Sequence, residues 1–285
     1  GMGLSLGFRA GVWNIGAEGQ FIAGALLGSA PAVYFFDSTN PLILPCMMLL
    51  GILGGMAWAA MPALLKTRFN ANEILVSLML VYVAELLLVH LVQGPWRNPQ
   101  GWGFPGTRMF PDAALLPMFF PGYRVHLGTL IAVLIPFVIW FVLIRTRFGF
   151  QIRVFGSAPL AARHAGIGNN QMVWTTLLVG GGLAGLAGVM EAASTIGQLM
   201  PKISPGYGFT AIIVAFLGRL HPVGVLLAGT VIAVTYIGGE SAQISAGLPK
   251  AVTGLFQGII LFYLLAFDLL TRYRLTRVST RGNAA

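Results

Sequence analysis

Three polar side chains lie close together in an otherwise apolar run near the start of the chain. Asn14, Glu18 and Gln20 alternate there with Gly16 and Gly19. Amide and carboxylate groups are costly in an apolar environment unless each finds a hydrogen-bond partner. Two glycines among them favour an interrupted helix, in which free backbone groups and the three side chains converge. The pattern indicates either a contact for a polar solute or polar contacts that hold neighbouring helices together.

A second polar group includes Asn70, Asn72 and Glu73. An asparagine before a helix, followed by a carboxylate in the first turn, is typical of a helix N-terminus. The alternative is that Asn72 and Glu73 contact a gate at one end of a path through the protein. The residues themselves leave both alternatives open.

A third candidate is the connector 147–168, which is too long for a hairpin turn and too mixed in polarity to span a membrane. Its alanines favour a short helix that Gly166 can end. Such a helix would either rest on lipid headgroups or dock into a groove of a soluble partner protein. The connector is therefore a candidate interaction surface.

The chemistry that the sequence lacks is equally informative. It contains no GxxxxGK[ST] phosphate-binding loop, so the chain is not itself a P-loop ATPase. It has no HExxH motif and no cluster of Cys and His that would bind a metal, and its single cysteine, Cys46, lies in an apolar run. We expect no catalytic residues, no metal and no cofactor.

Composition indicates a membrane protein. Of 285 residues 56% are hydrophobic and 9% are charged, and the mean hydropathy is +0.82. A soluble domain carries about 25% charged residues, so this chain has too little charge for a surface in water. The net charge is +9, but its basic residues lie in short connectors instead of on one face, which argues against a nucleic-acid partner.

Seven apolar runs approach or exceed the length of about 20 residues that crosses the hydrocarbon core. Backbone groups cannot stay unpaired in lipid, so these runs predict helices and an all-α, polytopic transmembrane bundle in contact with membrane lipid. The predicted spans are residues 19–36, 46–65, 74–92, 125–144, 172–190, 220–239 and 251–267.

Two segments depart from this pattern of full spans. Residues 1–17 begin like a helix already under way, and we expect at least one spanning helix upstream of them in the complete protein. Between Pro201 and Arg219 only about a dozen apolar residues remain, too few for a crossing at about 1.5 Å per residue. This predicts a half-helix or a steeply buried segment, opened by residues 205–208. Irregular backbone at that depth must be covered by protein or line a cavity, which makes the segment a candidate for a translocation path.

Four pairs of glycines lie four residues apart inside apolar runs, a spacing that lets helices approach closely in lipid. They are Gly24 and Gly28, Gly51 and Gly55, Gly181 and Gly185, and Gly254 and Gly258.

Basic residues gather in alternate connectors, which predicts that these connectors face the cytoplasm. They are Lys66, Arg68, Arg145, Arg147, Arg153, Arg163 and Arg219, with Arg272, Arg274, Arg277 and Arg281 in the tail. The long loop 94–124, with aromatic residues suited to the membrane interface, would then lie outside, despite its Arg97, Arg108 and Arg124.

The run 8–21 resembles the signature of bacterial ABC permeases of the simple-sugar and nucleoside branch, within the branched-chain amino acid permease family. The runs 69–77 and 148–167 resemble the same branch, as do 180–193 and 206–209. The resemblance covers essentially the whole chain. The form of residues 14–20 is more similar to nucleoside permeases than to ribose or xylose permeases.

The resemblance implies a type II-like importer fold, with residues 1–285 as a single transmembrane permease domain. It implies a second permease subunit, as a homo- or heterodimer, around a central path in the bacterial cytoplasmic (inner) membrane. An ABC ATPase would bind on the inner side and an extracytoplasmic solute-binding protein on the outer side. The connector 147–168 would be the coupling helix, and by position its ATPase contacts would be Arg153, Gly156, Ala161, Ala162, Arg163 and Gly166.

From these observations we expect ATP-driven import of a nucleoside or simple sugar, with hydrolysis by a separate subunit. Asn14, Glu18 and Gln20 would lie along or beside the path, and Asn72 and Glu73 at its cytoplasmic gate. The alternative is a secondary transporter driven by an ion gradient, for which Glu18 is the best candidate proton carrier. A membrane enzyme is disfavoured because the sequence lacks a cluster of acid, base or metal-binding groups.

Overall fold

The computed structural model describes residues 1–119, 125–247, 249 and 251–272. Within these residues helices predominate and no strand is present apart from an isolated bridge between Met118 and His126, so the all-α prediction is confirmed. The chain divides into two compact units, Gly1–Gly229 and Thr230–Ala285. A single permease domain over residues 1–285 stays a prediction.

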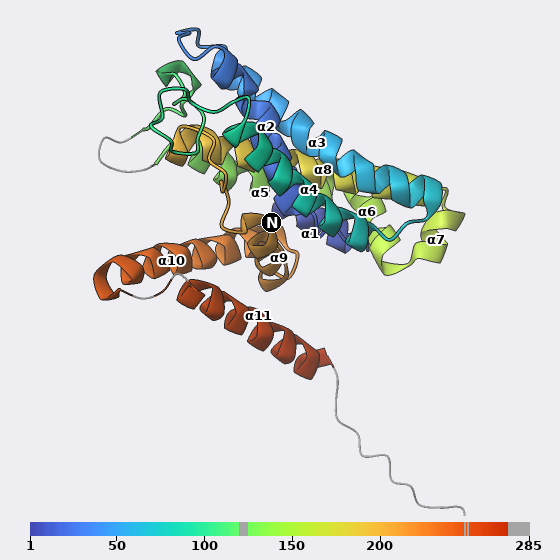
Figure 1. Cartoon of the computed structure of the whole chain (residues 1–285). Helices are drawn as coiled ribbons and strands as arrows, with labels where there is room; N and C mark the ends of the chain where they lie inside the picture. The colour runs from blue at the N-terminus through green and yellow to red at the C-terminus, as the bar shows by residue number, and fades with distance from the viewer. Residues whose placement is uncertain (120–124, 248, 250, 273–285) are drawn as a thin grey trace, which may run out of the picture. The chain divides into compact units, whose positions relative to one another are not determined.

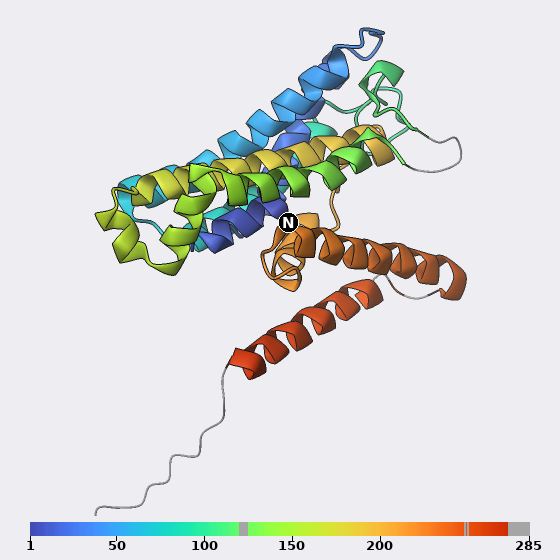
Figure 2. The same cartoon turned by 180° about the vertical axis from the view of Figure 1, so that it is seen from behind.

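Four long helices form the centre of the first unit. They are α2 (Ala17–Tyr34), α3 (Ile43–Phe69), α4 (Glu73–Gln93) and α8 (Asn169–Glu191). Helices α2, α3 and α8 lie side by side in both views, and α4 packs along α2 and α3 (Figures 1 and 2). Helix α2 is therefore enclosed by protein along much of its length.

Glycines bring these helices into close contact. A Cβ atom added at Gly24 of α2 would collide with the backbone of Gly185 in α8, and one added at Gly55 of α3 would collide with the carbonyl of Gly181. Such backbone approach replaces the hydrophobic driving force that lipid removes between helices. Three of the four predicted glycine pairs lie at these crossings, and the role of Gly254 and Gly258 in the second unit stays a prediction.

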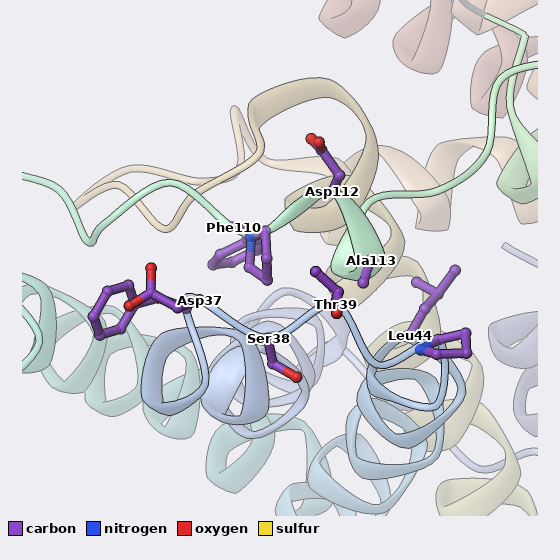
Figure 3. A pocket seen from close by; sticks show the side chains of 10 residues that line it. Asp37, Ser38, Thr39, Leu44, Phe110, Asp112 and Ala113 are labelled. Carbon is purple, nitrogen blue, oxygen red and sulfur yellow. The ribbon is translucent and has the colours of Figure 1, made fainter.

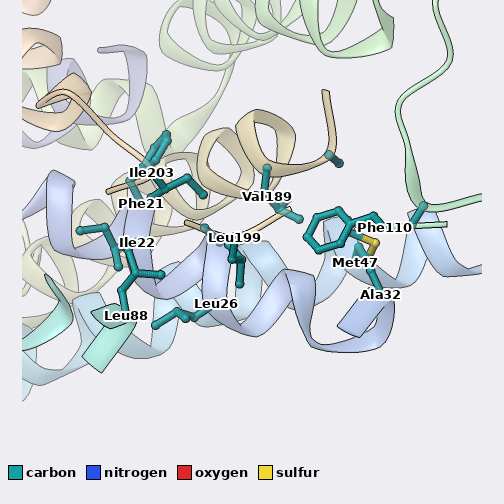
Figure 4. Close-up of a cluster of buried hydrophobic side chains, with 14 of the residues drawn as sticks. Phe21, Ile22, Leu26, Ala32, Met47, Leu88, Phe110, Val189, Leu199 and Ile203 are labelled. Carbon is teal, nitrogen blue, oxygen red and sulfur yellow. The ribbon is translucent and has the colours of Figure 1, made fainter. Parts of the chain in front are cut away.

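Apolar side chains fill the space around the glycine contacts. Figure 4 shows the larger cluster, in which Phe21, Ile22 and Leu26 of α2 meet Met47 of α3 and Val189 of α8. Because van der Waals packing stabilises helix association in lipid, this cluster fixes α2 against its neighbours. The polar residues at the start of α2 are thereby held in a rigid setting.

Five helices within the described residues are long and apolar enough to cross a membrane, and multi-pass character is supported. They are α3, α4, α8, α5 (Leu127–Arg145) and α10 (Pro222–Ala246). Five of the seven predicted spans are thus borne out. The predicted span 19–36 forms α2, but Glu18 and Gln20 make its first turn polar, and protein covers it. The predicted span 251–267 forms α11 (Ala251–Arg272), several of whose side chains lie outside the described residues.

The first unit has two distinct ends. We call the one with α6 (Arg147–Ser157) and α7 (Pro159–His164) the connector end. There the indole of Trp174 donates a hydrogen bond of 3.1 Å to the Thr67 hydroxyl, joining the start of α8 to the end of α3.

We call the opposite end the loop end. It carries residues 35–42 and the loop 94–119 with the short helix η1 (Asp112–Ala114). The rings of Tyr34 and Trp96 meet edge to face there, with 6.2 Å between centroids. Of the basic residues used to orient the chain, Arg124, Arg274, Arg277 and Arg281 and the side chain of Arg272 lie outside the described residues. The orientation stays a prediction.

Candidate functional site

The predicted interruption near the start of the chain is present. Helix α1 (Met2–Arg9) ends eight residues before α2 begins, and residues 10–16 are not helical. Gly11 has a φ of +70°, a conformation that favours glycine, and Val12 N–H donates to the Gly7 carbonyl at 2.8 Å. The chain therefore leaves α1 through a defined turn.

Asn14 and Gln20 hold the interruption together by pairing their amide groups. Asn14 Nδ2 donates to Gln20 Oε1 at 2.9 Å, and Gln20 Nε2 donates back to Asn14 Oδ1 at 3.1 Å. The backbone N–H of Gly16 also donates to Asn14 Oδ1. Both side chains are at most 2% exposed, so their hydrogen-bonding capacity is used within the protein in this conformation.

Glu18 joins this interruption to a distant part of the chain. Its carboxylate accepts a 2.5 Å hydrogen bond from the backbone N–H of Gly208, and the Ser204 hydroxyl hydrogen-bonds the same carboxylate. Gly208 lies in the first turn of α9 (Tyr207–Leu217), where a negative charge is stabilised by the free N–H groups and the helix dipole. Glu18 therefore caps α9 across 190 residues of sequence.

Helix α9 has 11 residues, which confirms the predicted half-helix. Gly206 precedes it with a φ of +106°, and a Cβ atom at Gly208 would collide with the backbone of Glu18. The starts of α2 and α9 thus meet directly. We call this meeting point the helix junction, defined by Asn14, Glu18, Gln20, Ser204 and Gly208.

An aromatic cluster lies beside the helix junction. The ring centroids of Phe8 and Trp13 are 5.2 Å apart, those of Phe8 and Phe216 5.1 Å, and those of Trp13 and Phe216 5.9 Å. Trp13 is 41% exposed although the neighbouring Asn14 is buried. Trp13 was not among the predicted site residues, and its place directly before the polar run is the signal that points to it.

Asn72 and Glu73 form a helix N-terminus, as one of the two alternatives predicted. Asn72 Oδ1 accepts hydrogen bonds from the N–H groups of Ile74 at 2.9 Å and Leu75 at 3.5 Å, and Glu73 pairs with Lys66. The contact between α4 and the interruption occurs one turn further along, where Gly16 approaches Ser77. The structure therefore does not bring Asn72 and Glu73 into the helix junction.

The connector forms two short helices, and the second matches the predicted helix ended by Gly166. Gly166 has a φ of +79°, and Ile167 N–H closes the turn on the Ala162 carbonyl at 2.9 Å. Of the six residues predicted to contact an ATPase, five are exposed, whereas Ala162 is fully buried. Leu160 was not among the predicted contacts, and its side chain on the same short helix is 72% exposed.

A pocket of about 690 Å³ opens at the loop end (Figure 3). Residues 36–44 form one wall and residues 110–113 around η1 form the other. Asp37 and Asp112 are exposed at its rim, and the Arg108 guanidinium lies 4.0 Å from the centre of the Phe36 ring. The pocket offers carboxylates, hydroxyls and aromatic faces to an external partner.

His126 lies at the loop end and directly precedes α5. Burial lowers the pKa of its imidazole, which is therefore neutral at pH 7. Among the described residues no three His, Cys, Asp or Glu side chains gather as a metal site.

Comparison with known families decides the class of this chain. The family described as branched-chain amino acid transport system / permease component matches residues 1–265. The chain belongs to this permease family. The predicted resemblance is confirmed, and the alternative of an ion-gradient-driven transporter is not supported.

Individual relatives agree with this family. The permease is 38% identical to the glucose ABC transporter permease protein TsgB13 of Haloferax volcanii, over 100% of this chain and 77% of the relative. It is 29% identical to the guanosine ABC transporter permease protein NupP of Bacillus subtilis, over 99% of this chain and 81% of the relative. It is 22% identical to the nucleoside ABC transporter permease protein NupB of Lactococcus lactis, over 92% of this chain and 74% of the relative. No solved structure matches.

Membership defines the general role of the protein. This permease is a membrane-spanning transport subunit of an ABC transporter and not an enzyme, since ATP is hydrolysed by a separate subunit. The family implies an ATPase and a solute-binding protein as partners.

Proposed function

We propose that this permease imports a neutral, hydroxyl-rich solute, either a nucleoside or a simple sugar, across the bacterial cytoplasmic membrane. The similarity of the whole chain to a glucose permease and to a guanosine permease carries the proposal. The higher identity to the glucose permease favours a sugar, whereas the form of residues 14–20 favours a nucleoside. Both solutes present several hydroxyl groups and no net charge, so one type of path suits either.

The proposed path runs beside the helix junction. The paired amides of Asn14 and Gln20 and the Glu18 cap would fix the wall where two helices begin, a feature that suits a solute site within a membrane. Trp13 offers an exposed aromatic face next to this wall, on which a sugar or a base can stack. Asn72 and Glu73, nearer the connector end, would border the cytoplasmic gate.

The proposed coupling surface is the connector 147–168. An ATPase that closes on ATP would move α7 through contacts with Arg153, Gly156, Ala161, Ala162, Arg163 and Gly166. The exposure of five of these residues and of Leu160 supports the assignment. Ala162 would contribute through packing, because its side chain faces the interior beside Ile167.

The remaining partners follow from the two ends of the first unit. The connector end would face the cytoplasm and the loop end the binding protein. A second permease subunit, identical or different, would complete the central path.

Uptake by the complete transporter tests this proposal. Cells that express the permease with its partners would be given labelled nucleoside or labelled glucose, each with excess of the other, unlabelled, as competitor. A complex whose ATPase lacks its phosphate-binding lysine provides the background. ATPase-dependent uptake of either solute supports the proposal, and competition identifies which solute is preferred. Uptake of neither would overturn it.

A further inference from the structure

A cavity of about 300 Å³ at the connector end is lined by two arginines. Its lining residues are Arg9, the last residue of α1, and Arg153, Gly156 and Ser157 of α6. A Cβ atom at Gly156 would collide with the carbonyl oxygen of Arg9, so α6 rests directly on the end of α1. The two guanidinium groups therefore belong to elements in direct contact.

The positive charge of this cavity is not neutralised within the described chain. Neither guanidinium lies within 4 Å of a carboxylate of the described residues, and the two repel each other. Glu73, an acidic residue at the connector end, is paired with Lys66. Arg9 is only partly exposed, which limits the water available to solvate its charge. Two such cations favour an anion from outside the chain.

Arg9 connects the cavity to the helix junction. Arg9 ends α1, and the non-helical residues 10–16 lead from it directly to the helix junction. Helix α7 begins two residues after Ser157, which lines the cavity. A partner held in the cavity would contact both the connector and the end of α1.

We propose that a carboxylate side chain of the partner ATPase inserts between Arg9 and Arg153 and links the ATPase directly to α1. This inference rests on the proposed docking of the ATPase at the connector. Each guanidinium offers a planar set of N–H donors that matches the two oxygens of a carboxylate. Because Arg9 is only partly exposed, an ion pair that includes it is less screened by water than a pair between two fully exposed side chains.

The link adds a second route of coupling. Movement of the ATPase would act on α7 and, through Arg9, on the interruption that contains Asn14. A lipid phosphate has similar chemistry, but the proximity of the cavity to the exposed face of α7 favours a protein partner. The lipid is therefore an outcome that the test must separate.

The test uses the complete transporter in proteoliposomes, with Arg9→Gln, Arg153→Gln and the double variant. Arg68→Gln is the matched control, because Arg68 is an exposed arginine at the same end and does not line the cavity. We expect each single variant to lower solute transported per ATP hydrolysed about tenfold, with little further loss in the double variant, because both arginines hold one carboxylate. The control retains normal coupling. If Arg9→Gln, Arg153→Gln and the double variant couple ATP hydrolysis to transport normally, the inference is wrong. If Arg163→Glu abolishes coupling in the same assay, the proposed function remains intact.

Two further measurements identify the anion. In vesicles of neutral phosphatidylcholine, the unmodified transporter should still move more solute per ATP hydrolysed than the variants do. If it falls to their level and recovers with phosphatidylglycerol, the anion is a lipid headgroup and the inference is wrong. In the second measurement, Arg153→Glu is combined with ATPase variants in which exposed acidic residues are changed singly to lysine. One of these should restore uptake, and the absence of any suppressor would contradict a carboxylate partner.

Discussion

The side-chain amides of Asn14 and Gln20 are buried and hydrogen-bonded to each other, which makes the energetic role of the pair testable. Asn14→Ala leaves the Gln20 amide without its partner, and an unpaired buried polar group costs about 1–3 kcal/mol. We expect a lower melting temperature of the purified permease and reduced uptake. Changing Gln20 to Leu in the same chain should recover part of the lost stability, because it removes the unpaired amide. Asn170→Ala is the control, since Asn170 is exposed at the start of α8, and an equal effect there would contradict this role.

Glu18 distinguishes a structural cap from a proton carrier. A cap needs an oxygen that accepts the Gly208 N–H, which an amide also provides, whereas a proton carrier needs a titratable group. We therefore expect Glu18→Gln to retain a large part of the uptake and Glu18→Ala to lose most of it. Uptake assays with both variants, normalised to membrane-inserted protein, provide the measurement. Complete loss in Glu18→Gln with intact folding would restore the proton-carrier alternative.

Helix crossings set the tolerance of the bundle to larger side chains. Gly24 of α2 touches the backbone of Gly185 in α8, so no side chain fits between them. Gly24→Leu should separate the two helices and reduce the yield of monodisperse protein, at a cost of at least about 1–3 kcal/mol. Gly168→Leu, just before α8 in the same unit, is the control, because the nearest atom to a Cβ there is 3.8 Å away. Size-exclusion chromatography in detergent compares the two variants, and equal yields would contradict the importance of this contact.

The connector should affect coupling without affecting insertion. Arg163→Glu reverses an exposed charge on α7, and Arg68→Glu makes the same change at the end of α3. We expect the first to lower uptake at least tenfold with normal amounts of protein in the membrane, and the second to have little effect. Uptake and immunoblotting of the membrane fraction measure the two quantities. Normal uptake in Arg163→Glu would count against the coupling assignment.

Local patterns predict elements well in this chain. The glycines around Asn14 predict the interruption, and the shortage of apolar residues before Arg219 predicts the half-helix α9. Both follow from backbone rules that act within a few residues. The predicted span 19–36 forms α2, and this enclosed helix tolerates Glu18 and Gln20 among small residues.

Contacts between segments far apart in the chain could not be predicted from the sequence. Glu18 and Gly208 are 190 residues apart, and neither residue type carries a local signal for the other. The approach of Gly156 to Arg9 likewise depends on how α1 and α6 pack. Polar residues in apolar runs could be identified, but their partners are set by tertiary packing.

At the scale of the whole first unit, the two ends offer different chemistry. The connector end presents two arginines that pair with no carboxylate of the described residues, and an exposed leucine on a short helix. The loop end presents Asp37 and Asp112 at the rim of an open pocket. The helix junction connects to both ends. Helix α1 leads from it to the connector end, and helix α2 leads from it to the loop end. The two ends therefore favour different partners, and the carboxylates at the rim are suited to basic side chains of the binding protein.

The two carboxylates at the rim of the loop-end pocket should take part in docking of the binding protein. Asp37→Asn and Asp112→Asn remove charge with little change of shape, so each should weaken docking of the binding protein about two- to fivefold, as is usual for exposed ion pairs. The measurement is the concentration of binding protein that gives half-maximal stimulation of ATP hydrolysis in proteoliposomes. The difference from the unmodified permease should shrink as salt is raised, because screening already weakens the same pairs. Asn40→Asp, an isosteric change in the same connection, is the control and should not weaken docking. Unchanged stimulation in both aspartate variants at low salt would show that the binding protein docks elsewhere on the permease.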